Sequence, residues 1–249
     1  MGDISVQESI RGIVYATAVE EVWKILLDAV QTAGFDNVLY GFTRFHTDYG
    51  FGDDNDHLFL TNFNRDYMQG YFLEGRYRNG PLVRWAVDNA GVCSWRWVQD
   101  HYHELSDAER EVADFNWSKG VTAGYTIAFP NSLRRYKGAI GMSLAPGAGT
   151  QEDADAIWAR HGEALELLSC TAHLKLISMP LPRRMLTKRQ REVLEWIADG
   201  KTVGDIAQIL GLNRATVEKH LRLARESLGV ETTAQALLKA SLHNHIFTF

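Results

Sequence analysis

The sequence predicts an α+β protein: an N-terminal α/β/α sandwich with one antiparallel sheet, joined to a C-terminal all-α domain of four helices that contains a helix-turn-helix. Three observations lead to this fold class. The chain has 249 residues, which suits one or two domains, and an apolar content of 45%, which is enough for sizeable cores. Helical and strand-like patterns alternate before residue 178, and only helical patterns follow it. A proline-containing segment and a change in the sign of the net charge separate the two regions.

The proline-containing segment defines the predicted domain boundary. Pro180 and Pro182 lie within residues 178–185, and proline cannot continue a helix. Residues 183–249 hold 11 Lys and Arg against 7 Asp and Glu, a net of +4, whereas residues 1–182 carry a net of −9. A basic domain on an acidic body is typical of proteins in which only one part meets nucleic-acid phosphates. We therefore predict a domain over residues 1–177, a linker over residues 178–185 and a second domain over residues 186–249.

The N-terminal region begins with a helical pattern and then mixes both kinds of element. Thr17-Ala18-Val19-Glu20 is a capping-box pattern that predicts a helix ending at Gly34. Ser106-Asp107-Ala108-Glu109 predicts another helix start, and that helix ends near Gly120. The remaining predicted helices are two short pieces within residues 65–89, broken at Asn79-Gly80-Pro81, and one long helix over residues 151–178. The predicted strands cover residues 37–45, 57–62, 92–98, 123–129 and 138–145. One antiparallel sheet with helices on both faces is the simplest packing of these elements.

The C-terminal region shows four helical patterns and one sharp turn. Gly211-Leu212-Asn213 forms the turn, and Asn213 is a natural N-cap for the helix that follows. A short helix, a three-residue turn and a longer helix make a helix-turn-helix. The predicted helices cover residues 187–200, 203–210 and 214–228, and the last begins near Thr233.

The longer helix of this motif carries a basic outer face. In a helix-turn-helix the second helix enters the major groove of DNA, where Arg and Lys can donate to guanine and Thr can reach a phosphate or a thymine methyl. The alternative is a solvated helix face of mixed charge. The candidate DNA-binding residues are Arg214, Thr216, Lys219, Arg222 and Arg225.

The C-terminal residues go beyond this geometry and resemble the LuxR-type helix-turn-helix over about 60 residues. The resemblance rests on Leu186-Thr187, Glu192-Val193-Leu194, Asp205-Ile206-Ala207, Thr216-Val217 and His220-Leu221. It implies DNA contacts for Thr216, Lys219 and Arg222 and an internal bracing role for His220. Gln190 departs from the family, which usually has glutamate there.

The N-terminal region resembles the autoinducer-binding domain of LuxR-type quorum-sensing regulators. The resemblance is anchored by residues 34–42, Pro81, Trp95 and Gly120 with Gly124. It implies a pocket for an acyl-homoserine lactone between the sheet and one helical layer. The implied ligand-binding residues are Leu39, Gly41, Phe63, Tyr67, Tyr71, Gly80, Val83, Trp95 and Thr122, with either Gly141 or Ser143 on the last strand.

Two positions of the implied pocket depart from the family. The family typically has Asp directly before the proline, where it accepts the amide N–H of the ligand, and this chain has Gly80. The family also has Trp where this chain has Tyr67. A buried amide without a partner weakens binding by roughly 1 to 3 kcal/mol. Three interpretations stay open: a common acyl-homoserine lactone, a different and aromatic molecule in a pocket enlarged at Gly80, or a pocket filled by side chains such as Trp85 or Trp97.

These features predict a ligand-responsive transcription regulator that binds a palindromic operator in double-stranded DNA as a homodimer. The stripe of Ile157, Trp158, His161, Leu165, Leu168 and Ala172 on the long helix is either a dimerisation surface or the face that packs on the sheet of the same chain. One alternative function is a regulator that pairs with a related protein and reads no ligand. Another is an enzyme, but no activated nucleophile and no pair of acids is evident in the implied pocket.

Several further classes are disfavoured by composition. No run approaches the ~18 to 20 apolar residues of a membrane span, the first residues show no secretory pattern, and Cys93 and Cys170 are too few for a disulfide framework. We therefore expect a cytoplasmic protein that does not bind membranes. The sequence predicts no cofactor and no metal site, because residues 100–104 read as a solvated loop and residues 53–56 lack the glutamate that ends an EF-hand loop.

Overall fold

The computed structural model describes residues 4–130, 133–180 and 186–246. The chain divides into two compact units, Met1–Leu176 and Ile177–Phe249. Residues 181–185 of the predicted linker lie outside the described residues. Among the described helices, none combines the length and the apolar composition that crossing a bilayer requires.

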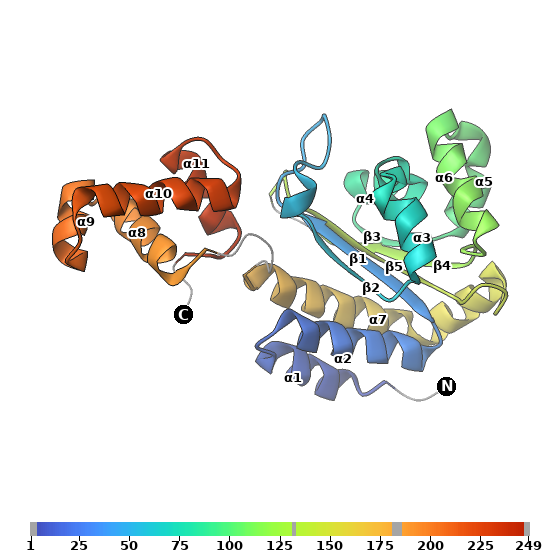
Figure 1. The fold of residues 1–249 in the computed structure, drawn as a ribbon. Coiled ribbons are helices and arrows are strands. Elements are labelled where there is room, and N and C mark those ends of the chain that lie inside the picture. The colour runs from blue at the N-terminus through green and yellow to red at the C-terminus, as the bar shows by residue number, and fades with distance from the viewer. Residues whose placement is uncertain (1–3, 131–132, 181–185, 247–249) are drawn as a thin grey trace. The chain divides into compact units, whose positions relative to one another are not determined.

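The first unit is built on one five-stranded sheet, as predicted (Figure 1). The strands lie in the order β2-β1-β5-β4-β3, and every neighbouring pair is antiparallel. The central β5 pairs along its whole length with β1, from Asn37 opposite Ser143 to Thr43 opposite Lys137. The strands are β1 Asn37–Thr43, β2 Leu58–Thr61, β3 Gly91–Ser94, β4 Gly124–Ala128 and β5 Lys137–Ser143.

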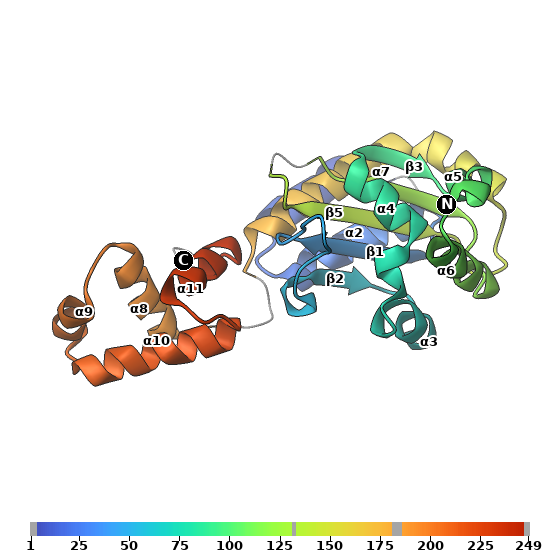
Figure 2. The same ribbon diagram turned by 90° about the horizontal axis from the view of Figure 1, so that it is seen from above.

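Helices cover both faces of this sheet. One face carries α1 Val6–Tyr15, α2 Val19–Ala33 and the 28-residue α7 Gln151–Ser178 (Figure 1). On the other face, α4 lies across β4 and β5 when the unit is viewed from above (Figure 2). The elements on that side are α3 Arg65–Met68, a π-helical turn Gln69–Leu73, a 3-10 turn Arg76–Asn79, α4 Pro81–Asp88, α5 Arg96–Asp100 and α6 Asp107–Ser118.

Local sequence explains most of these boundaries. Gly34, with φ of 116°, adopts the left-handed conformation that ends α2. Ser106 caps α6 and accepts a hydrogen bond from the Glu109 backbone N–H, which completes the predicted capping box. At α2 the N-cap is Ala18 rather than Thr17, and the Glu21 carboxylate accepts the backbone N–H of Thr17.

Three predictions on secondary structure were wrong or incomplete. The strand expected over residues 92–98 ends at Ser94, because Trp95 has helical backbone angles and α5 follows. Helix α1 was not predicted. Residues 100–104, predicted as a solvated loop, end α5 and form a 3-10 turn over Tyr102–Glu104, with Asp100, His103 and Glu104 exposed.

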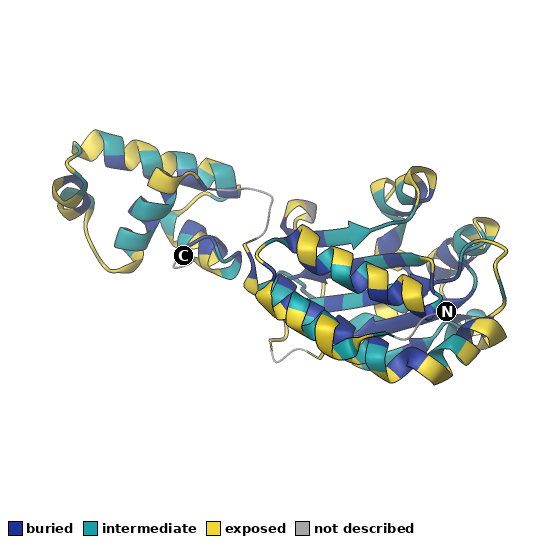
Figure 3. Cartoon of the chain, turned by 90° about the horizontal axis from the view of Figure 1, so that it is seen from below, coloured by how far each residue is buried: buried dark blue, intermediate teal, exposed yellow. Residues whose placement is uncertain are grey.

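The apolar stripe of α7 packs on the sheet of its own chain. His161, Leu165, Leu168 and Ala172 are buried, and the aromatic ring of Trp158 stacks on Tyr125 of β4. The interpretation of this stripe as a dimerisation surface is therefore wrong. The outer sides of the helices on this face are exposed (Figure 3).

The second unit is the predicted four-helix domain. Its helices are α8 Lys188–Ala198, α9 Val203–Leu210, α10 Arg214–Leu228 and α11 Thr233–Leu242. Each begins at a side-chain cap, in chain order Thr187, Thr202, Asn213 and Thr232. Gly211, with φ of 64°, ends α9 in the left-handed conformation and allows the turn into α10. The buried core comprises Leu186, Val193, Leu194, Ile206, Ala207, Val217, Leu221, Ala224, Leu228, Ala236, Ala240 and Ile246.

Candidate ligand pocket and nucleic-acid interface

A cavity of about 170 Å³ lies between the sheet and the helical layer that contains α4. Its lining comes from β1, β5 and β4 on the sheet side and from α3, α4 and α6 on the helical side. Its surface is mainly apolar. This volume is similar to that of an engineered protein cavity of ~150 Å³ that binds benzene.

The structure brings nine of the ten predicted ligand-binding residues into this lining. Ser143 is the exception: it is fully buried at the end of β5 and does not line the cavity, whereas Gly141 does. Whether the lining residues bind a ligand stays a prediction. The nine are Leu39, Gly41, Phe63, Tyr67, Tyr71, Gly80, Val83, Trp95 and Thr122.

Small residues on the sheet leave the space that the cavity occupies. Gly41 of β1 and Ala139 and Gly141 of β5 lie on the pocket face of neighbouring strands. A Cβ atom added at Gly141 would lie 3.6 Å from Trp95, an ordinary contact. At Gly41 the corresponding space is taken by the ring of Phe59, 3.0 Å from an added Cβ. Of these two glycines, only Gly141 leaves room for a further side-chain atom, next to Trp95.

Stacked aromatic rings form the helical wall. Phe63 and Tyr67 stack with ring centroids 4.5 Å apart, and Tyr67 and Tyr71 stack at 5.3 Å. A second pair, Phe72 and Tyr77, is nearly parallel at 4.6 Å. Such rings offer flat apolar surfaces to a ligand and lose little side-chain entropy when they bind one.

Hydroxyl and indole groups supply the polar part of the lining. The Tyr67 hydroxyl donates to Asn116 Oδ1 at 3.0 Å, and the Trp95 indole N–H donates to Thr126 Oγ1 at 2.9 Å. The Tyr71 hydroxyl has no hydrogen-bond partner among the described residues. Burial raises the pKa of Tyr67 and of Tyr71, so both stay neutral at physiological pH. The Tyr71 hydroxyl is thus free to donate to, or accept from, a ligand.

Gly80 does not enlarge the pocket. A Cβ atom at this position would lie 3.1 Å from the Tyr71 hydroxyl oxygen and 3.2 Å from both the Tyr77 carbonyl and Val83 Cγ2. The predicted enlargement is not found, because the Tyr71 hydroxyl lies in the space beside Gly80, and a side chain at this position needs that hydroxyl to shift by a few tenths of an ångström. Gly80 instead serves as the N-cap of α4, with Pro81 in the first helical position.

The third interpretation, a pocket filled by Trp85 or Trp97, is also wrong for these residues. Neither lines the cavity. Trp97 stacks on His101 with ring centroids 4.7 Å apart and packs against the cluster of Val98, Leu105 and Ala113.

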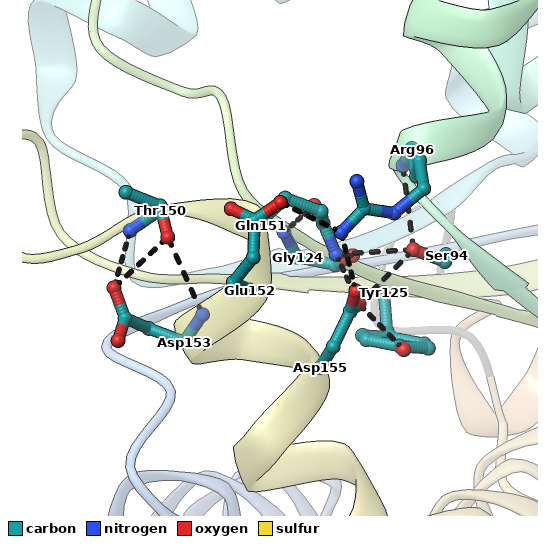
Figure 4. Close-up of polar contacts among 9 residues, drawn as sticks. All are labelled: Ser94, Arg96, Gly124, Tyr125, Thr150, Gln151, Glu152, Asp153 and Asp155. Atoms are coloured by element: carbon teal, nitrogen blue, oxygen red, sulfur yellow. Dashed lines mark hydrogen bonds and ion pairs between the residues drawn. The ribbon is translucent and has the colours of Figure 1, made fainter.

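A polar network holds the backbone on both sides of Trp95 against the first turns of α7 (Figure 4). Asp155 accepts hydrogen bonds from Arg96 at 2.8 Å, from the Tyr125 hydroxyl at 2.8 Å and from Ser94 Oγ at 3.3 Å. Gln151 bonds both the N–H and the carbonyl of Gly124, and that carbonyl also accepts the N–H of Trp95.

This network favours a charged Asp155. Burial raises its pKa, but the hydrogen bonds from Arg96, Gln151 and Tyr125 together outweigh burial, so the pKa lies below its usual value. The same contacts, led by burial, raise the pKa of Tyr125 to about 12. The pocket residue Trp95 is therefore fixed to the helix that crosses the opposite face of the sheet.

Several lining residues were not predicted from the sequence. Asn116 and Thr126 complete the hydrogen bonds of Tyr67 and Trp95, and Lys137 lies at the start of β5. The alternation of strand residues could have found Lys137, because it shares a face with Ala139 and Gly141. No comparable signal marks Asn116, whose position depends on how α6 packs.

The outer face of α10 in the second unit is the candidate nucleic-acid interface. Lys219 and Arg222 are exposed, and they line a shallow hollow together with Ala215, Glu218, Leu221 and Arg225. Lys219 has no ion-pair or hydrogen-bond partner among the described residues. This face carries the positive charge that phosphate binding requires.

Three of the five predicted DNA-binding residues form a hydrogen bond or an ion pair within the unit, and a fourth, Arg214, packs against α9. Arg222 pairs with Glu226 at 2.5 Å, and Arg225 donates to Thr233 Oγ1 at 3.1 Å. Thr216 Oγ1 donates to the capping side chain of Asn213 at 2.9 Å. The guanidinium of Arg214 lies against Gly204 of α9, where an added Cβ would be 2.6 Å away. The sequence predicts that these side chains bind DNA. The structure shows the intramolecular contacts that they form when no DNA is bound.

Both units match known families. The family described as autoinducer binding domain matches residues 18–176, and the family described as bacterial regulatory proteins, luxR family, matches residues 184–240. The HTH-type quorum sensing-dependent transcriptional regulator RpaR of Rhodopseudomonas palustris is 35% identical over 181 residues, which are 71% of this chain and 70% of RpaR. The transcriptional activator protein AnoR of Acinetobacter nosocomialis is 22% identical over 227 residues, 89% of this chain and 90% of AnoR.

The fold is similar to a solved structure over its whole length. The crystal structure of Escherichia coli SdiA aligns with a TM-score of 0.54 and 19% identity, and the alignment covers 98% of each chain. This similarity confirms the predicted fold class of a sheet-based sensor domain followed by a four-helix domain with a helix-turn-helix.

Proposed function

We propose that this chain, a member of the LuxR-type quorum-sensing transcription regulators, is controlled by a small aromatic molecule and acts in the cytoplasm. It belongs to that family through both its autoinducer-binding domain and its helix-turn-helix domain. Its family assigns it DNA binding and transcription regulation, not enzymatic activity. The observation that carries the choice of ligand is the cavity itself, with stacked aromatic walls and neutral hydroxyl groups.

The lining gives little support for a common acyl-homoserine lactone. The amide N–H of such a ligand needs a buried acceptor, and no described lining residue is a carboxylate. The Tyr71 hydroxyl beside Gly80 can accept one hydrogen bond, but a neutral hydroxyl is a weaker acceptor than a carboxylate. A planar ring that packs against the aromatic wall of Phe63, Tyr67 and Tyr71 uses the same apolar lining without that amide.

Ligand burial between α4 and the sheet supplies a means of control. A ligand shifts a conformational equilibrium only by the difference between its affinities for the two states. A molecule that fills the cavity stabilises the arrangement in which α4, Trp95 and the α7 network are packed together. We expect that arrangement to be the one that supports operator binding.

We further propose that the chain binds a palindromic operator as a homodimer. One recognition helix makes few base contacts, so two half-sites about one DNA turn apart, near 34 Å, are needed. With the buried stripe of α7 unavailable, we assign the contact to its outer face, where Leu167 and Leu174 are 49% and 65% exposed. Residues seven apart lie on the same side of a helix, so a second copy can cover both.

Mass spectrometry of the protein, denatured after purification from its native host, is the direct test of the ligand. We expect a co-purified aromatic molecule released in stoichiometric amount. Release of an acyl-homoserine lactone would reject the ligand assignment. Protein free of any small molecule that still binds its operator, alone or paired with a related protein, would reject control by a ligand.

Two substitutions test whether restoring the family's pocket residues gives a response to acyl-homoserine lactones. Gly80→Asp combined with Tyr67→Trp restores the residues implied by the family, and a reporter strain then measures the response to acyl-homoserine lactones of several chain lengths. We expect a gain of response of about ten- to a hundredfold in effective concentration, the value of one buried hydrogen bond. Gly80→Ala is the matched control for the loss of space beside Tyr71, and a silent reporter would contradict our account of the pocket.

The DNA interface is tested in gel shifts with the operator. Lys219→Ala removes a charge that has no partner in the unit, and Arg222→Ala removes one that Glu226 holds. Both should weaken binding, by ~1 to 3 kcal/mol if the side chain reads a base. Lys188→Ala, exposed on α8, is the control outside the recognition helix. Unchanged binding by both α10 variants would reject the assignment of this face.

A further inference from the structure

The charge of the pocket is the starting point for a narrower identification of the ligand. Among the described lining residues there is no Asp or Glu, and the one permanently charged side chain is Lys137. It lies half-buried at the start of β5, opposite Thr43 of β1. A neutral ligand gives this ammonium nothing to pair with.

Lys137 has spare hydrogen-bonding capacity. Its Nζ donates to the carbonyl of Val87, in the last turn of α4, at 2.5 Å. An ammonium has three N–H groups, and no described acidic side chain forms an ion pair with Lys137. The pKa of the neighbouring His46 lies below its usual value. Burial is the main cause, and the positive charge of Lys137 adds to it. His46 is therefore neutral and does not compete for an anion.

The hydroxyl groups of the pocket lie at the other end of the same strand. Gly141 is close to Trp95 and to Thr126 Oγ1, at 3.6 and 3.8 Å from an added Cβ. Gly141 is four positions after Lys137 on β5, which corresponds to about 13 Å at ~3.3 Å per residue. Helix α4 runs along the pocket in the opposite sense to β5, with Gly80 and the Tyr71 hydroxyl at its start and Val87, which accepts the hydrogen bond from Lys137, near its end. The pocket is thus long, with neutral hydroxyls at one end and a cation at the other.

We propose that the ligand is a hydroxyaryl carboxylic acid whose carboxylate binds Lys137 and whose hydroxyl binds at the Tyr71 and Thr126 end. The identification rests on the proposed function, since it names the ligand class of the same pocket. A carboxylate at Lys137 forms a charge-assisted hydrogen bond in a partly buried site, which is stronger than a neutral one. The aromatic ring between the two ends packs against the wall formed by Phe63, Tyr67 and Tyr71.

Isothermal titration of the full-length protein with 4-hydroxycinnamate and with its methyl ester tests this proposal. The two probes share the ring, the hydroxyl and nearly the same length, and only the acid is charged. We expect the acid to bind at least tenfold more tightly than the ester. Equal affinities, tighter binding of the ester, or binding of neither compound would overturn the proposal.

Variants of Lys137 locate the effect. Lys137→Met and Lys137→Gln should each weaken binding of the acid about tenfold and leave binding of the ester unchanged, whereas Lys137→Arg should keep the preference for the acid. Melting temperatures without ligand check that each variant is folded, and the milder Lys137→Gln serves if Lys137→Met is not. Lys119→Met is the control for loss of a lysine outside the lining. An unchanged affinity for the acid in both neutral variants would overturn the assignment of Lys137.

The test separates this proposal from the proposed function. If the ester binds as tightly as the acid and either compound changes operator affinity, the pocket senses a small molecule and only the role of Lys137 fails. If the protein purified from its host carries no small molecule and operator binding needs none, control by a ligand fails as well.

Discussion

The two faces of the sheet are made by alternate residues of the same strands, yet one face is closed and the other is hollow. Val38, Tyr40 and Phe42 of β1 point toward α7 and are at most 3% exposed. The residues between them, Leu39 and Gly41, face the cavity. On β5, Ile140 and Met142 are fully buried on the closed face, whereas Ala139 and Gly141 line the hollow one. The comparison shows that side-chain size, alternating along each strand, creates the pocket while the closed face supplies stability.

The largest effect should come from a cavity opened on the closed face. Leu168 of α7 is fully buried, so Leu168→Ala should reduce the free energy of unfolding by about 2 to 5 kcal/mol. Leu167→Ala is the matched control, because the neighbouring side chain is 49% exposed and should change stability by less than ~0.5 kcal/mol in the monomer. Urea unfolding at low protein concentration measures both. Similar losses for the two variants would mean that the closed face is not the stabilising one.

The closed face also contains a buried histidine that should make stability depend on pH. His173 Nδ1 lies 3.0 Å from the Tyr40 hydroxyl, its ring stacks on Phe129, and it is 2% exposed. Burial, together with the charge of Arg44, lowers the pKa of His173 from 6.5 to about 4. The neutral form is therefore favoured in the folded state, and the unfolded chain takes up the proton first as the pH falls.

The lowered pKa of His173 determines how the free energy of unfolding changes with pH. Stability is complete above pH 6.5 and is lost as the pH falls toward about 4, by roughly 2 kcal/mol between pH 7.5 and 5. His173→Gln, which keeps a partner for Tyr40, should flatten this dependence in urea unfolding. His103→Gln, at a side chain that is 76% exposed, should not. The prediction fails if wild type and His173→Gln lose stability equally over this interval.

Periodicity and capping predicted the architecture because they depend on local sequence. The strand alternation of β1 and β5, the caps of α6 and α8, and the turn at Gly211 were all visible in the chain. The strand over residues 92–98 was overestimated, since its alternation continues through Trp95 into α5. Nothing in that pattern shows the network around Asp155 that turns the backbone at Ser94.

The sequence predicted most of the residues that line the pocket, but it did not predict the shape of the cavity. The family resemblance located Tyr71 and Gly80, but only the folded position of the π-helical turn Gln69–Leu73 next to the start of α4 brings the Tyr71 hydroxyl into the space beside Gly80. The stripe on α7 had the same limitation, because a helix face that packs on a sheet and one that packs on a second copy have the same period. Tertiary contacts, which the sequence does not state, decide both cases.

A pair of glycines on β5 tests the comparison with the smallest change in side chain, a single methyl group. At Gly138, on the closed side, an added Cβ would lie 2.9 Å from His173, 3.1 Å from Phe42 and 3.3 Å from Phe129. Rings packed in a core cannot move apart freely, so Gly138→Ala should reduce the free energy of unfolding by about 1 to 3 kcal/mol. At Gly141, on the hollow side, the nearest atom would be 3.6 Å away, and Gly141→Ala should leave stability unchanged or raise it by up to ~1 kcal/mol, because alanine restricts the unfolded chain. Thermal and urea unfolding of both variants measure the difference, and the opposite order would show that the hollow face is as tightly packed as the closed one.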